Sequence, residues 1–207
     1  MKHPFRRSSS RLRLVQSQDQ PWPVSPTRAG MFGMWVFLGS LSVLFATTLF
    51  ACLLITIQAG AWRTDAHPGL PSKLWVSTLF LLMVSLAFEV GRWQIRLNRQ
   101  QGLSAMLLLA NLLGLGFLLN QIQVWRLVAE IDLPSTAKSL YQFSFGVLTG
   151  VHAFHVLGGF VPLALCTVHA LRGRYSSFDH ASVAYCAMYW HFLGLMWVVI
   201  VSALLLL

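Results

Sequence analysis

Two histidines three positions apart, His152 and His155, are the residues of this sequence best placed to do chemistry. They lie in a long apolar run, Phe143 to Ala170, that also contains four glycines. On a helix, residues three apart share one side. An imidazole can ligate a metal, exchange a proton near neutral pH, or hydrogen-bond another helix.

Haem ligation is the most demanding of these roles, because two axial ligands must meet at one level. His155 and His169 are fourteen residues apart, nearly on one side of a helix. The last apolar run supplies only His191. At about 1.5 Å per residue, its depth differs from that of His155 by about 12 Å. We therefore expect no cofactor or metal on this chain and a structural, hydrogen-bonding role for His152 and His155. A free-standing b-type cytochrome is the alternative.

The glycines favour helix packing. Gly146 and Gly150 have the GxxxG spacing that lets another helix approach closely in lipid. Gly158 and Gly159 extend the small-residue surface, and Pro162 predicts a kink beyond them.

Composition places the chain in a membrane. Of the 207 residues, 56% are hydrophobic and only 10% are charged, which is less than half the usual charged share of a soluble domain. The formal net charge of +9 is explained by basic residues that flank membrane spans, and we expect no nucleic-acid partner. The cysteines Cys52, Cys166 and Cys186 lie in apolar runs without CxxC spacing, as small buried hydrophobes do.

Apolar runs longer than 18 residues predict an all-α fold, a bundle of five transmembrane helices. We predict spans at about 31–58, 74–95, 103–127, 143–171 and 183–207. Residues 1–29 are predicted to be a disordered basic cytoplasmic tail, and residues 30–207 the transmembrane domain.

Lysine and arginine set the orientation, because cytoplasmic loops carry the excess of positive residues. With the N-terminus inside and the C-terminus outside, eleven of the 15 basic residues are cytoplasmic and four are not. The four are Arg63, Lys73, Arg126 and Lys138.

Polar residues within the spans have structural explanations. Glu89 and Arg92 are predicted to form an interfacial ion pair. The amides of the third span are predicted to donate hydrogen bonds between helices: Asn111, Asn120, Gln121 and Gln123. No internal repeat is evident, which disfavours a small transporter.

Four motifs occur in order along the chain: Gly33-Met34-Trp35 with Phe37 and Ser40, Leu115 to Leu118 with Gln121 and Trp125, Gly150-Val-His152-Ala-Phe-His155-Val156, and Tyr189-Trp190-His191-Phe192 with Trp197. Together they resemble subunit III of the haem-copper oxidases, whose members carry Gly-Phe-His-Gly-Leu-His-Val and Tyr-Trp-His-Phe. The resemblance covers about residue 30 to the C-terminus. Some bacterial members have only five helices, the last five of the seven-helix form.

The resemblance implies a non-catalytic subunit of a cytochrome c or quinol oxidase, in aerobic respiratory electron transport in the bacterial cytoplasmic membrane. Its partners would be the catalytic subunit I, which holds the haems and copper, and subunit II, together with lipids bound in a cleft. An accessory subunit of a nitric oxide reductase is the alternative. The residues expected to serve structure, subunit contact or lipid binding are His152, His155, His191, Tyr189, Trp190, Gln121, Gly146 and Gly150.

The sequence departs from the family at four acidic positions. The family's carboxylates, which are linked to proton delivery or lipid anchoring, fall on Leu41, Val124, Ala184 and Gly194. The acidic features of the family are therefore not carried over to this chain.

Overall fold

The computed structural model describes residues 26–58, 72–130, 135–176 and 180–206, which fold into five long α-helices. In chain order these are α1 (Pro26–Gln58), α2 (Lys73–Arg96), α3 (Gln100–Glu130), α4 (Ser135–Leu171) and α5 (Ala181–Leu206). These ranges contain no β-strand. The predicted all-α fold with five membrane helices is confirmed.

Each helix contains a segment long and apolar enough to cross a membrane. The segments have between 24 and 31 residues, which at a rise of 1.5 Å corresponds to about 36 to 46 Å. A hydrocarbon core is only about 30 Å thick, so the helix ends extend into the headgroup region. For this reason the helices are longer than the predicted apolar runs.

The first helix begins inside the segment expected to be a tail. α1 starts at Pro26, whereas the tail was predicted to end at residue 29. Proline is favoured in a first helical turn, because the N–H that it lacks would be unpaired there anyway. Residues 1–25 of the predicted tail lie outside the described ranges.

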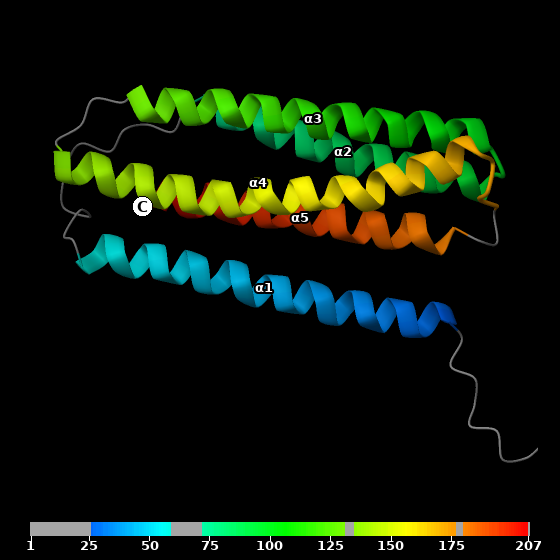
Figure 1. Cartoon of the computed structure of the whole chain (residues 1–207), viewed down its shortest axis with the longest axis horizontal. Coiled ribbons are helices and arrows are strands. Elements are labelled where there is room, and N and C mark those ends of the chain that lie inside the picture. The colour runs from blue at the N-terminus through cyan, green and yellow to red at the C-terminus, as the bar shows by residue number, and fades with distance from the viewer. Residues whose placement is uncertain (1–25, 59–71, 131–134, 177–179, 207) are drawn as a thin grey trace, which may run out of the picture.

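Four of the helices form a bundle in which each packs against two others. α2 contacts α3 and α5, and α4 contacts α3 and α5. Figure 1 shows α3 and α4 in front, with α2 and α5 behind them. The bundle therefore has two opposite faces, one made by α3 and α4 and the other by α2 and α5.

The first helix lies outside this bundle. α1 packs against α5 and α4, and Figure 1 shows it apart from α2 and α3. A smaller share of its membrane segment is buried than in any other helix. Most of α1 is thus left for lipid or for another chain.

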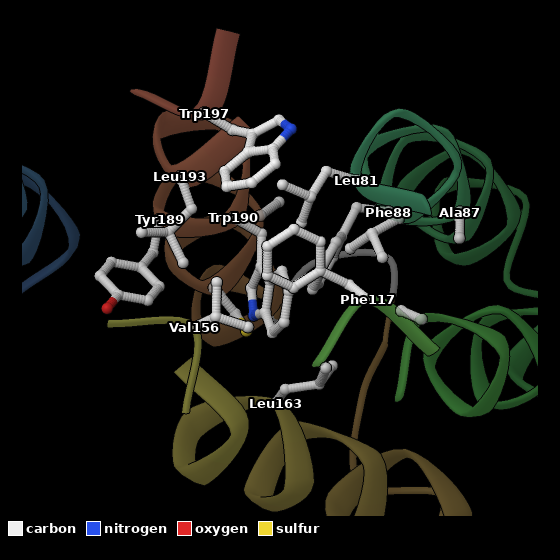
Figure 2. Packing of buried hydrophobic residues seen from close by; sticks show 14 of the residues in the cluster. Leu81, Ala87, Phe88, Phe117, Val156, Leu163, Tyr189, Trp190, Leu193 and Trp197 are labelled. Atoms are coloured by element: carbon white, nitrogen blue, oxygen red, sulfur yellow. The ribbon is translucent and has the colours of Figure 1, made fainter. Parts of the chain in front are cut away.

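The bundle core is built on aromatic rings. Trp190 and Trp197 of α5, Phe117 of α3 and Phe88 of α2 are at most 1% exposed. In Figure 2, Trp190 and Phe117 lie between the ribbons of the bundle. The rings of Phe117 and Trp197 meet edge to face at a centroid distance of 5.1 Å, a favourable geometry for aromatic pairs.

Two glycines make this aromatic core possible. A Cβ added at Gly114 of α3 would lie 2.9 Å from Phe160 Cζ and 3.0 Å from Trp190 Cη2. One added at Gly159 of α4 would lie 2.8 Å from Tyr189 Cε1. The flat rings therefore occupy the space that a side chain would need.

Hydrogen bonds between helices confirm part of the prediction for the third span. Asn111 Nδ2 donates to Thr167 Oγ1 at 2.9 Å, and Asn120 Nδ2 donates to Ser77 Oγ at 2.7 Å. Gln123 instead accepts, from Lys73 Nζ at 2.8 Å. In lipid such bonds are favourable, because the hydrocarbon offers no competing partner.

Two tryptophans add bonds of the same kind. Trp197 Nε1 of α5 donates to Thr78 Oγ1 of α2 at 3.0 Å. Trp125 Nε1 of α3 donates to Thr149 Oγ1 of α4 at 2.9 Å. Each indole thereby links two neighbouring helices.

One end of the bundle is tied together outside the spans. Gln100 Nε2, at the start of α3, donates to the backbone oxygen of Tyr175, which follows α4, at 2.7 Å. Burial raises the pKa of the Tyr175 phenol above its ordinary value. The α2–α3 and α4–α5 connections therefore lie at the same end.

We predict that Gly114→Ala lowers the stability of the purified chain in mild detergent by about 1 to 3 kcal/mol, because the new methyl group overlaps two aromatic rings. The measurement is thermal unfolding followed by near-ultraviolet circular dichroism. The control is Gly39→Ala, since nothing lies within 4 Å of a Cβ added at Gly39. Equal unfolding midpoints for the two variants would contradict the prediction.

We also predict that Thr78→Val costs about 0.5 to 2 kcal/mol, because it removes the acceptor of the buried Trp197 indole while preserving shape. The same unfolding assay measures this cost. Thr47→Val is the control, because the Thr47 hydroxyl bonds only to carbonyls of its own helix. An equal loss in the control would show that the interhelical bond contributes nothing.

Candidate functional site

The first of the paired histidines, His152, points into the bundle core. Its side chain is fully buried, and the ring centroids of Trp197, Phe117 and Phe45 lie 5.1, 5.7 and 6.1 Å away. Neither of its ring nitrogens has a hydrogen-bond partner among the described residues. The predicted hydrogen bond of His152 is therefore wrong, and the ring packs as one member of an aromatic cluster.

The second, His155, is hydrogen-bonded as predicted, although within its own helix. Its Nδ1 donates to the backbone oxygen of Val151 at 2.7 Å. Its ring lies 5.1 Å from that of Phe45, the same α1 residue that contacts His152. The predicted shared side of the two histidines is confirmed by their common contact with Phe45, although the ring of His152 also contacts α3 and α5.

The consecutive residues Tyr189, Trp190 and His191 point in three directions, as neighbours on a helix must. The Tyr189 hydroxyl donates to the backbone oxygen of His155 at 2.8 Å, which links α5 to α4. Trp190 is 1% exposed and fills the core. His191 points to α2. One tripeptide thus contacts three parts of the structure.

His191 joins an ion pair. Glu89 and Arg92 form the predicted pair, with 2.7 Å between Glu89 Oε1 and Arg92 Nη1. His191 Nε2 lies 2.9 Å from the same oxygen. Sequence reasoning missed this third member, because the two helices place together residues that are 102 positions apart. The contact with Glu89 also gives His191 a different role from His155, since the ring of His191 faces α2 whereas that of His155 faces α1.

Gln121 does not behave as the sequence suggested. Its side chain is 1% exposed, and both amide atoms are buried without a partner among the described residues. The prediction that it donates a hydrogen bond between helices is therefore wrong.

Two of the four positions to which the resemblance assigns a family carboxylate are part of the apolar core. Leu41 is 8% exposed and Val124 is fully buried. A carboxylate at either position would be surrounded by apolar groups and would need a partner to offset its lost hydration. Of the other two positions, Ala184 is partly buried, and a Cβ added at Gly194 would lie 3.6 Å from Ser85 Oγ.

The predicted glycine surface is open. A Cβ added at Gly146 or Gly150 would find nothing within 4 Å. Both glycines line a groove of about 340 Å³ between α3 and α4, together with Trp125 and Gln142. No described helix of this chain fills the groove.

A larger cleft separates α1 from α4 and α5. Its volume is about 630 Å³, and its lining includes Phe37, Leu165 and Tyr185. Tyr189 also lines it. The walls are mostly apolar, as the acyl chain of a lipid would require.

These side chains take part in packing, in hydrogen bonds and in the walls of two grooves. The described residues contain no group of three or more His, Cys, Asp or Glu side chains that could hold a metal ion. Cys52, Cys166 and Cys186 are buried free thiols, as predicted.

Comparisons with known proteins agree with this geometry. The sequence model of the family described as "Cytochrome c oxidase subunit III" matches residues 27–205. A "Cytochrome c oxidase subunit 3" of Synechocystis sp. is 30% identical over 173 residues, covering 82% of this chain and 72% of the relative. A "Probable quinol oxidase subunit 3" of Staphylococcus aureus is 31% identical over 176 residues, covering 83% and 85%.

The family match spans nearly all of the described helices, and both relatives are named as subunit 3 of an oxidase. The five helices and the aromatic–histidine framework are thus those of a multi-pass membrane subunit within an oxidase complex. The chain belongs to the cytochrome c oxidase subunit III family, whose members are components of haem-copper oxidases.

Proposed function

We propose that this chain is a non-catalytic subunit that stabilises the catalytic subunit of a haem-copper oxidase in a bacterial cytoplasmic membrane. The supporting observation is that its polar framework is used internally. His152 is enclosed by three aromatic rings, and Tyr189 is bonded to the backbone of His155. Side chains used in this way hold helices together and are not presented to a substrate.

The haems and copper of the assembled enzyme belong, in this proposal, to the partner catalytic subunit, with subunit II beside it. The chain then contributes to aerobic respiratory electron transport without binding oxygen or an electron donor. Its own contribution is a rigid surface against which the large subunit folds.

The proposed contact with the large subunit is the groove along Gly146 and Gly150. Small residues let two helix backbones approach closely in lipid, where packing contacts replace the hydrophobic effect as the driving force. Both glycines face open space. Trp125, on the other wall of the groove, offers a large ring for a partner helix to pack against.

The cleft between α1 and the bundle is the proposed lipid site. Its lining of apolar and tyrosine side chains suits an acyl chain, with the tyrosine hydroxyls nearer to polar groups. A bound acyl chain would fill the space between α1 and the bundle, where α1 packs less closely than the other helices do.

The proposed orientation places the N-terminus inside. Eleven of the 15 basic residues are then cytoplasmic. The hydrogen bond from Gln100 to Tyr175 supports this assignment, because it puts the basic residues near both connections, Arg99 and Arg174, at one end of the bundle.

We predict that Gly150→Leu reduces co-purification of the large subunit at least fivefold, because the new side chain fills the groove. The affinity-tagged chain is purified from native membranes in mild detergent. Haem absorbance and the identity of the co-purifying chains are then measured per mole of tagged chain.

Gly39→Leu is the matched control, since Gly39 also faces open space but lies on α1. It should retain the large subunit. If both variants retain the large subunit equally, the groove is not the surface that contacts it. A native chain that brings down no haem protein would overturn the proposed function itself.

A further inference from the structure

The outer surface of α2 carries a charged cluster within the membrane. The most exposed residues of this helix recur every three or four positions and so form one stripe. The stripe consists of Trp75, Leu79, Leu82, Leu86, Glu89 and Trp93, each of them at least 54% exposed. From Trp75 to Trp93 it extends about 27 Å, close to the thickness of the hydrocarbon core.

Glu89 lies inside the stripe, one helical turn before its last residue, Trp93. It precedes Arg96, the last residue of α2, by seven positions, which places it about 10 Å from the helix end. An ionisable group at such a depth is unfavourable against lipid and normally faces protein or water.

The partners within this chain engage only part of the carboxylate. Arg92 Nη1 and His191 Nε2 both contact Glu89 Oε1, at 2.7 and 2.9 Å. No hydrogen bond or salt bridge from the described residues reaches Glu89 Oε2. Arg92 and His191 are themselves 25% and 33% exposed. The cluster therefore presents a hydrogen-bond acceptor to whatever covers α2.

The outer surface of α3 shows what a face covered by lipid alone requires. Its exposed stripe is apolar over about 21 Å, through Leu108, Leu112, Leu115, Leu119 and Ile122. The exposed stripes of α2 and α3 have the same residue spacing, but only the α2 stripe contains a carboxylate, Glu89. The carboxylate thus distinguishes α2 as the surface that lipid alone suits poorly.

A second copy of this chain is a poor occupant. In a two-fold dimer within one membrane, each α2 would meet its copy at the same depth. The two Glu89 carboxylates would then lie together with like charge. A partner of different sequence avoids this repulsion.

We propose that the exposed stripe of α2 packs against a transmembrane helix of another chain, one that carries a hydrogen-bond donor or a cation at the depth of Glu89. The apolar residues of the stripe supply the packing, and the donor pairs with the free oxygen of Glu89. This surface belongs to the α2–α5 face, opposite the groove at Gly150, so the proposal does not rest on that groove.

The test is photo-cross-linking in the organism's own membranes, with p-benzoylphenylalanine in place of Leu86. We expect an adduct with a different polypeptide, identified by mass spectrometry. Adducts with lipid only would overturn the proposal. An adduct of twice the mass of this chain would identify a second copy and would also overturn it.

The role of Glu89 is tested in the same cross-linking chain. Glu89→Ala should lower the yield at Leu86 at least fivefold, whereas Glu89→Gln, which keeps an acceptor, should retain at least half. The matched control has the cross-linker at Leu112 on α3, where Glu89→Ala should change the yield less than twofold. A yield at Leu86 that does not depend on Glu89 would overturn the proposed pairing.

If the Glu89→Ala protein fails to accumulate, cross-linking at position 86 in the chain that keeps Glu89 still tests whether another polypeptide covers α2. The Gly150→Leu experiment measures retention of the haem protein, and the Leu86 adduct measures occupancy of the opposite face. The two proposals can therefore fail separately.

Discussion

The interior of a membrane offers no hydrogen-bonding partner, and this constraint determines how the chain uses its polar residues. Helices satisfy the backbone, and most hydroxyls in α1 bond back to their own helix, as Thr47 and Thr56 do. In the bundle, asparagine and indole groups reach across to neighbouring helices instead. These polar side chains therefore bond either to the backbone of their own helix or to a neighbouring helix, and the second kind of bond fixes the relative position of two helices.

Shape supplies the rest of the specificity, because hydrocarbon tails are as apolar as the helices. Gly114 and Gly159 leave flat spaces that the rings of Phe160, Trp190 and Tyr189 occupy. The family's aromatic–histidine motifs contribute to this fit more than to any reaction. His152, the residue best suited to chemistry by type, is held by rings alone.

Length and apolarity were sufficient to predict the five helices, because a span needs about 20 apolar residues and little else. The three-residue spacing predicted the common side of His152 and His155. Contacts between distant helices could not be predicted: neither the Glu89–His191 pair nor the unpartnered amide of Gln121 leaves a periodic signal. The peripheral place of α1 was equally hidden, since a helix that is apolar all around does not indicate which side is buried.

The position of α1 also has a consequence for biosynthesis. Chains are made from the N-terminus, so α1 is synthesised before α2 and α3, yet its contacts are with α4 and α5, which follow them. Until α4 and α5 are made, the helices that α1 packs against are absent, and α1 must remain in lipid as an independent span. The uniformly apolar surface of α1 suits an independent span in lipid. The packing of α1 against α4 and α5, which forms the cleft, is then a late step of assembly.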